Sequence, residues 1–195
     1  MPCCRASDSD RWNSRYATEG EVWQSRPPRK LLTDYAQYIP THGIALDAAC
    51  GVANNGLFLA QHGLRVLALD ISEIALRIAK QRADQLQTTL YPALFDLVDA
   101  WLPPDYFDVI VNFNYLERTT FPVYRLALKN GGLLLFESFV KTADDVLFPE
   151  YYLFPGELLQ AFADFEILHY AEKQIYGTTK LTAQLVARKV DRSKQ

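Results

Sequence analysis

The stretch IALDAACGVANNGLFLAQHGLRVLALD, residues 44–70, constrains the fold more than any other part of the chain. It contains two apolar runs, and each ends on or beside an aspartate, Asp47 and Asp70. Between the runs lie a turn of small residues and a helix-like segment that stops at Gly63. The pattern predicts a strand, a sharp turn, a helix and a second strand, which together are typical of a nucleotide-type binding site.

The rest of the chain extends this pattern. Apolar strand-like runs alternate with helix-like segments as far as GLLLFESF, residues 132–139, which predicts a parallel sheet with helices on both faces. Two strand-like runs then follow, at 165–177 and 180–189, joined by a short polar loop that contains Gly177. Such a pair is a hairpin signal. We therefore predict an α/β fold: a Rossmann-like, doubly wound, mostly parallel seven-stranded sheet that ends in an antiparallel C-terminal hairpin.

The length of 195 residues favours one domain with a sizeable core. Within this single domain, 1–195, we expect residues 1–8 to form a disordered tail. Residues 9–40 are predicted to form an N-terminal helical cap, and residues 44–190 the sheet core.

Composition limits the partners. A net charge of −3 argues against nucleic acid, because phosphate binding needs a basic face. No apolar run reaches the roughly 20 residues of a membrane span. The three cysteines, Cys3, Cys4 and Cys50, form neither a disulfide framework nor a C-x-x-C metal spacing, which favours a reduced, cytoplasmic setting. We expect a small-molecule substrate, no metal, no nucleic acid, no membrane, and a monomer or weak dimer.

The small residues after the first strand would let a ligand touch the backbone, although close packing of strand and helix is an alternative explanation. The spacing of Gly51, Ala53 and Gly56 imitates the dinucleotide motif G-x-G-x-x-G with one alanine substituted, and Asp70 would then hold a nicotinamide ribose. Asp47 argues against that interpretation. An acid at the end of the first strand would repel a pyrophosphate and attract an ammonium group, such as the amino group of methionine.

Several stretches resemble a known family. LDAACGVANNG looks like motif I of the class I S-adenosylmethionine-dependent methyltransferases, D/E-x-G-x-G-x-G, with alanines at 49 and 53. FDVIVNFNYLER is similar to the fourth-strand motif of that family, and LALKNGGLLLFESF to its helix, Gly-Gly turn and fifth strand. With the hairpin, the resemblance runs from about Trp12 to Arg188. The patterns W-N-x-R-Y, C-G-x-A-x-N and FNYLER are closest to the tellurite-resistance and thiopurine-type branch, which often has arginine where this chain has Asn54.

The resemblance implies S-adenosylmethionine as cofactor. Asp70 would accept hydrogen bonds from both ribose hydroxyls, Asp96 would take the adenine amino group, and Asp47 would act near the methionine end. The full set of cofactor-binding residues that the resemblance implies is Trp12, Tyr16, Asp47, Ala49, Cys50, Gly51, Asn55, Asp70, Ile71, Phe95, Asp96, Leu97, Asn112 and Phe113.

Two segments outside these motifs carry aromatic residues. The segment with Trp12, Tyr16 and Trp23 would fold over the cofactor, or else pack as a surface aromatic cluster. Residues 140–155 include Phe148 and other aromatics without clear periodicity. We expect this stretch to form a wall over the acceptor pocket, and a loop packed against the core is the alternative.

The sequence contains no obvious catalytic triad, metal site or pair of catalytic acids. A methyl group on a sulfonium is already activated, so holding donor and acceptor in line would do most of the work. Tyr115, Glu117 and Glu137 are weak candidates for a proton acceptor. We predict methyl transfer to a small-molecule acceptor, with a soft sulfur, selenium or tellurium nucleophile as the hypothesis. The alternatives are a non-enzymatic S-adenosylmethionine-binding protein and an NAD-dependent oxidoreductase.

Overall fold

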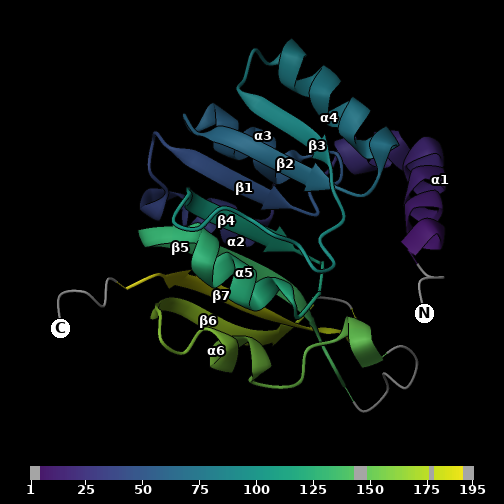
Figure 1. Ribbon diagram of the computed structural model, residues 1–195. Coiled ribbons are helices and arrows are strands. Elements are labelled where there is room, and N and C mark those ends of the chain that lie inside the picture. The colour runs from purple at the N-terminus through teal and green to yellow at the C-terminus, as the bar shows by residue number, and fades with distance from the viewer. Residues whose placement is uncertain (1–4, 143–148, 176–177, 191–195) are drawn as a thin grey trace.

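A computed structural model of the chain describes residues 5–142, 149–175 and 178–190 (Figure 1). Its strands form one seven-stranded sheet in the order β3-β2-β1-β4-β5-β7-β6. The strands are β1 (Ile44–Ala48), β2 (Arg65–Asp70), β3 (Leu90–Leu94), β4 (Phe107–Phe113), β5 (Leu128–Val140), β6 (Glu166–Gln174) and β7 (Leu181–Arg188).

The predicted sheet is confirmed. Strands β1 to β5 pair in parallel, whereas β7 pairs antiparallel with both β5 and β6. The C-terminal hairpin therefore inserts its second strand between β5 and its own first strand, which explains why β7 is the more apolar of the two. Gly177, predicted to lie in the loop of the hairpin, is outside the described residues.

Helices cover both faces of the sheet (Figure 1). One apolar core joins the sheet to Leu31, Leu57 and Leu76, and the other joins it to Phe121 and Phe162 on the opposite face. Among the described residues, no helix combines the length and apolar character needed to cross a membrane. The helices are α1 (Arg5–Gln24), α2 (Lys30–Asp34), α3 (Asn54–Gln61), α4 (Glu73–Gln85), α5 (Thr120–Ala127) and α6 (Glu157–Ala161), with the short 3₁₀ turns η1 (Ala36–Tyr38) and η2 (Pro149–Tyr151).

The N-terminal boundary differs from the sequence expectation. Helix α1 begins at Arg5, so residues 5–8 are helical rather than part of a disordered tail, and residues 1–4 lie outside the described residues. Asp8 lies in the first turns, where a negative charge favours the helix end, and it forms an ion pair with Arg11 at 3.0 Å. These local interactions favour a helix that begins earlier than its apolar residues indicate.

Helix α1 is attached to the segment that joins β2 to α4. The Ser9 hydroxyl donates to the carbonyl of Ile71 at 3.2 Å. The Asn13 side-chain oxygen accepts hydrogen bonds from the Ser72 hydroxyl at 2.8 Å and from the Ile74 amide at 3.3 Å. Because the first amides of a helix lack partners within the helix, Asn13 caps α4 from a distant part of the chain. These bonds hold α1 beside the carboxyl end of β2.

Arg82 of α4 fastens the other end of α1. Its guanidinium donates to the carbonyl of Val52 at 2.8 Å, to the side-chain oxygen of Asn54 at 2.6 Å and to the carbonyl of Gln24 at 3.4 Å. The amide nitrogen of Asn54 in turn donates to the carbonyl of Trp23 at 2.9 Å. Asn54 is thus the acceptor for an arginine from α4. The N-terminal cap and the turn after β1 are held as one unit.

Candidate functional site

The candidate site lies where the sheet changes direction. Strand β1 has β2 on one side and β4 on the other, and Asp47 is in register with Ala68 and Val111 on these neighbours. In open α/β sheets, ligands bind outside the carboxyl ends of the strands at such a switch point. The residues predicted to bind the cofactor follow or end β1, β2, β3 and β4, or lie on α1 next to them.

The turn after β1 has an alternating left-handed backbone. Ala49, Gly51 and Ala53 have φ angles of 52°, 53° and 58°. This region favours glycine, and a side chain there costs about 1 kcal/mol or more. The family motif D/E-x-G-x-G-x-G places glycines at these three positions. The structure therefore shows two alanines held in the conformation that glycine adopts freely.

Asp70 ties the end of β2 to this turn. Its side chain is 7% exposed. One carboxylate oxygen accepts a hydrogen bond from the Gly51 amide at 2.7 Å, and the other accepts one from the Ser72 amide at 2.8 Å. Burial raises the pKa of this carboxyl above its ordinary value, and the bonds from backbone amides oppose that rise. The carboxylate therefore has a fixed orientation between the turn and α4.

Asp47, on the neighbouring strand β1, is more deeply buried. One of its carboxylate oxygens accepts a hydrogen bond from the Gly56 amide at 2.7 Å. Burial raises the pKa of Asp47 to about 7, the Gly56 amide lowers it, and the charge of Asp70 raises it further. Gly56 is required here, because a Cβ at this position would lie 2.8 Å from the Asp47 oxygen. In the described part of the chain, backbone amides rather than cationic side chains bond to both carboxylates.

An aromatic cluster covers the turn. A Cβ added to Gly51 would lie 2.4 Å from the hydroxyl oxygen of Tyr16, so the tyrosine lies directly over the glycine backbone. The Tyr16 ring stacks on Trp12 with centroids 5.8 Å apart and contacts Trp23 at 5.5 Å. Burial, and then the charge of Asp70, raise the pKa of Tyr16. The segment thus forms an aromatic cluster, and this cluster lies over the predicted site.

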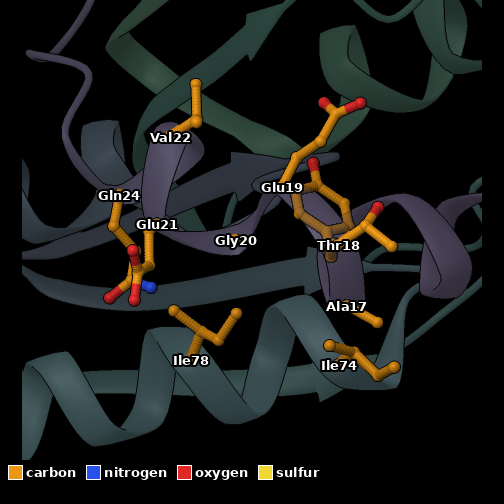
Figure 2. Close-up of a pocket in the computed structure, with 10 residues that line it drawn as sticks. Ala17, Thr18, Glu19, Gly20, Glu21, Val22, Gln24, Ile74 and Ile78 are labelled. Atoms are coloured by element: carbon orange, nitrogen blue, oxygen red, sulfur yellow. The ribbon is translucent and has the colours of Figure 1, made fainter.

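A hollow between α1 and α4 lies apart from the two carboxylates. Figure 2 shows Ile74 and Ile78 projecting from α4 toward α1, with Glu19 and Glu21 among the residues that line the hollow. Neither Asp47 nor Asp70 lines it. The buried carboxylates and the left-handed turn place the candidate site at the sheet edge instead.

The residues after β3 continue the same edge. The amide of Phe95 donates to the carbonyl of Asp70 at 2.9 Å, which joins this loop to the end of β2. A carboxylate oxygen of Asp96 accepts a hydrogen bond from the Val98 amide at 2.9 Å, as in an Asx turn. Leu97 is buried in the core. The loop carries Asp96 beside the predicted ribose-binding residue.

At the end of β4, Asn112 is fully buried. Neither its side-chain nitrogen nor its side-chain oxygen has a hydrogen-bond partner among the described residues. A buried amide without partners costs about 1–3 kcal/mol. An amide in this position therefore favours a polar partner from outside the described chain. The next residue, Phe113, packs in the apolar core that contains Leu31 and Leu57.

Glu137, near the end of β5, is engaged in hydrogen bonds. The side chain is 4% exposed. One of its oxygens pairs with the guanidinium of Arg29, and the other accepts a hydrogen bond from Gln184 at 2.5 Å. Both carboxylate oxygens are therefore engaged by neighbouring side chains.

The other two candidate bases are also poorly suited. One Glu117 oxygen accepts hydrogen bonds from the amide and the hydroxyl of Thr119, each at 3.1 Å. Burial raises the pKa of Tyr115, and the charges of Glu117 and Asp96 raise it further, so its phenol resists ionisation. Tyr115 is thus a poor base, and each of the two glutamates has at least one oxygen engaged by a neighbouring donor.

Only part of the segment 140–155 is described, and Phe148 lies outside that part. Leu153 is fully buried; its carbonyl accepts from the Lys141 amide at 2.8 Å and its amide donates to the Phe139 carbonyl at 2.9 Å. Arg118 donates to the carbonyl of Tyr152 at 3.0 Å. The described end is thus tied to β5, and its role as a wall over the acceptor pocket stays a prediction.

Three polar side chains that the sequence does not predict also act at this edge. Arg29 and Arg82 belong to no recognisable motif, and each acts through contacts with residues far away in the sequence. Asn13 lies within the W-N-x-R-Y pattern, but nothing in that pattern indicates that it caps α4. Two other residues predicted to bind the cofactor also lie at this edge. Cys50 is buried in the turn, and the Asn55 side chain accepts a hydrogen bond from the Arg29 amide at 2.9 Å.

Comparison with known proteins supports the family that the sequence indicates. Residues 45–132 match the family model described as "Methyltransferase domain". TehB from Haemophilus influenzae superimposes with a TM-score of 0.73 over 91% of this chain and 67% of TehB, at 22% identity. The chain has the class I methyltransferase fold. The predicted resemblance to this class is confirmed by the family model and by the shared fold.

Two further relatives extend the comparison. YqeM of Bacillus subtilis, a candidate methyltransferase by its name, is 32% identical over 108 residues, which are 51% of this chain and 43% of YqeM. The geranyl diphosphate C-methyltransferase of Streptomyces coelicolor, crystallised with Mg²⁺, geranyl diphosphate and S-adenosyl-L-homocysteine, superimposes with a TM-score of 0.69 over 83% of this chain and 79% of that chain, at 14% identity. This methyltransferase-like chain spans less than half the length of the curated relatives it matches.

The raised pKa of Asp47 predicts a pH-dependent gain in stability on substitution. The folded protein keeps the Asp47 proton up to about pH 7, whereas the unfolded chain releases it near 3.8. The stabilisation from this group is therefore complete below 3.8 and is lost as the pH rises to about 7. Asp47→Asn, whose side-chain oxygen still accepts from Gly56, should gain on the order of 2–4 kcal/mol of stability over the original protein between pH 4 and pH 8.

Urea unfolding at several pH values measures this gain. Asp84→Asn, at an exposed position on α4, is the matched control and should show no such trend. A constant difference between Asp47→Asn and the original protein at every pH would mean that Asp47 ionises normally in the fold.

Proposed function

We propose that this protein transfers a methyl group from S-adenosylmethionine to a small-molecule acceptor. The observation that carries the proposal is the pair of buried carboxylates, Asp47 and Asp70, which end adjacent strands and bond to backbone amides. Within the described ranges, no side-chain cation forms an ion pair with either carboxylate. Such carboxylates are suited to a ligand that brings its own positive charge. S-adenosylmethionine carries both an ammonium and a sulfonium group.

The hydrogen-bonding capacity of these residues fits this donor. A carboxylate oxygen can accept two hydrogen bonds, and each Asp70 oxygen receives one from a backbone amide. Each oxygen therefore retains room for one ribose hydroxyl. Asp47 would attract the ammonium group, and the unpartnered amide of Asn112 would bond a polar atom of the donor or acceptor. Tyr16 would close over the ligand from α1.

The chain's own residues would act mainly by orientation. Asp47 and Asp70 would hold the donor at the switch point, and the aromatic cluster of Trp12, Tyr16 and Trp23 would exclude water from one side. The sulfonium of the bound donor supplies an activated methyl group, so alignment with the nucleophile provides much of the acceleration. A mechanism in which the protein mainly orients donor and acceptor agrees with the lack of a ready base among Tyr115, Glu117 and Glu137.

The lack of a ready general base among these three residues favours a soft acceptor. A thiol or a reduced selenium or tellurium species forms its reactive anion near neutral pH with little help, whereas an alcohol needs a positioned base. The likeness to TehB, of the tellurite-resistance branch, agrees with this choice. We therefore take a soft sulfur, selenium or tellurium nucleophile as the acceptor class.

The other functions considered are less well supported. An NAD-dependent oxidoreductase would place a pyrophosphate beside the turn, where Asp47 would repel it. A non-enzymatic S-adenosylmethionine-binding protein would use the same carboxylates, so binding alone does not distinguish it from an enzyme. Methyl transfer to any small thiol would identify the protein as an enzyme. The complex of the related geranyl diphosphate C-methyltransferase with S-adenosyl-L-homocysteine agrees with a donor site in this fold.

Calorimetry tests the donor. We expect S-adenosylhomocysteine to bind, and Asp70→Ala to weaken its binding about ten- to a hundred-fold, because a hydrogen bond to a charged group contributes roughly 1.5–3 kcal/mol. Asp84→Ala, an exposed aspartate on α4, should leave the affinity unchanged. NAD binding as tight as that of S-adenosylhomocysteine would refute the donor assignment.

The acceptor class predicts a particular pH profile. Without a protein base, kcat/KM for thiol methylation should follow the pKa of the thiol itself and shift when a more acidic thiol is used. Glu117→Gln and Tyr115→Phe should each reduce the rate far less than the hundred-fold or so expected on removal of a true general base. A profile that ignores the thiol pKa, together with a large loss in one variant, would point to a base-assisted oxygen or nitrogen acceptor.

A further inference from the structure

Arg29, between α1 and α2, joins three parts of the sheet edge. Its backbone amide donates to the side chain of Asn55, in the first turn of α3, at 2.9 Å. The Nη2 atom of its guanidinium donates to a carboxylate oxygen of Glu137 and to the side-chain oxygen of Asn114, the latter at 3.3 Å. Both ends of the residue are therefore held, and the guanidinium has a defined position.

That position lies over the ends of β4 and β5. Glu137 is in register with Phe113, the last residue of β4, and the Asn114 amide donates to the Glu137 carbonyl at 2.8 Å. The two donor carboxylates end β1 and β2, on the other side of β4 in the strand order. Arg29 thus lies on the side of the switch point away from the proposed ribose site, where an acceptor would approach a donor methyl group.

The Arg29 guanidinium has more hydrogen-bond donors than its two bonds use. Arginine carries five N–H donors, and Nη2 supplies the two bonds above. Within the described ranges, no hydrogen bond reaches Nε or Nη1. The side chain is 36% exposed, so these groups are accessible to a ligand. A guanidinium that is already fixed by a carboxylate loses little freedom when it binds an anion, and its planar donors match carboxylate, sulfonate and phosphate oxygens.

Charge is therefore divided across the site. Asp47 and Asp70 give the β1–β2 side a negative character that suits a cationic donor, and Arg29 offers donors to an anion on the β4–β5 side. We propose that Arg29 selects acceptors that carry an anionic group in addition to their nucleophile. This proposal rests on the methyl transfer proposed above. Glu137 acts through Arg29 as a positioning residue, and Asn114 is the second anchor of the guanidinium.

Two thiols of similar size test this selectivity. The probes are 2-mercaptoethanesulfonate, which carries a sulfonate, and 2-mercaptoethanol, which is neutral. Because loss of Arg29 alone would leave Glu137 buried without a cation, the main variant is the double substitution Arg29→Gln/Glu137→Gln, which removes both charges together. Arg29→Lys keeps the charge but changes the donor geometry. Arg77→Gln, an exposed arginine on α4, is the control.

We expect the original protein to methylate the sulfonate thiol more efficiently than the neutral one. The double variant should lose about ten- to a hundred-fold in kcat/KM for the sulfonate thiol, mainly through KM, and change less than about three-fold for 2-mercaptoethanol. Arg29→Lys should fall between the two, and Arg77→Gln should match the original. Circular dichroism and thermal unfolding verify that each variant folds.

Equal losses for both thiols would overturn the proposal and leave Arg29 as a structural partner of Glu137. Weaker binding of S-adenosylhomocysteine, with unchanged binding of methylthioadenosine, which lacks the carboxylate, would also overturn it by assigning Arg29 to the donor. Binding of 2-mercaptoethanesulfonate to the protein saturated with S-adenosylhomocysteine, followed by NMR, separates this inference from methyl transfer. Anion binding that the double variant loses supports Arg29 even if no methyl is transferred, and a probe that binds both proteins equally contradicts it.

Discussion

The site depends on the hydrogen bond between the Gly51 amide and the buried carboxylate of Asp70. This bond joins the end of β2 to the turn after β1, and the Ser72 amide fixes the other carboxylate oxygen against α4. It can form because the turn adopts a left-handed backbone at alternate residues, including Ala49 and Ala53, at some cost in free energy. A shift in any of these elements would move an acceptor of hydrogen bonds that the proposed donor needs.

The burial of the two aspartates affects their ionisation. Asp47 and Asp70 both lie in a low-dielectric environment beside each other, so burial raises the pKa of each carboxyl. The fold accepts this cost because the backbone amides of Gly51 and Gly56 solvate the carboxylates in place of water. Arg29, on the β4–β5 side of this edge, pairs with Glu137 instead. Buried carboxylates at the β1–β2 side and unused guanidinium donors at the β4–β5 side thus lie along one row of strand ends, which suits the proposed cationic donor and anionic acceptor.

The sequence predicts the sheet well because the order of its elements follows from local patterns. Alternating apolar runs and helical segments fix the parallel strands, and the final pair of runs fixes the hairpin. Asp47 and Asp70 are also visible, since each falls at the end of an apolar run. Arg29, Arg82 and Asn13 could not be found in this way, because each acts on a partner that the fold brings near from far along the chain. The start of α1 at Arg5 was missed because charged residues, rather than an apolar stripe, favour its first turns.

The most direct test of this account is the proton balance of donor binding. Because burial raises the pKa of Asp47 to about 7, a fraction of the free protein molecules hold this proton at pH 7. An ammonium group bound beside the carboxylate would lower that pKa and expel the proton. Calorimetry of S-adenosylhomocysteine binding in buffers of different ionisation enthalpy should therefore show release of a fraction of a proton per site at pH 7, and none in Asp47→Asn. A binding enthalpy that does not depend on the buffer, or the same proton release in Asp47→Asn, would contradict the role of Asp47 as the residue that receives the positive donor.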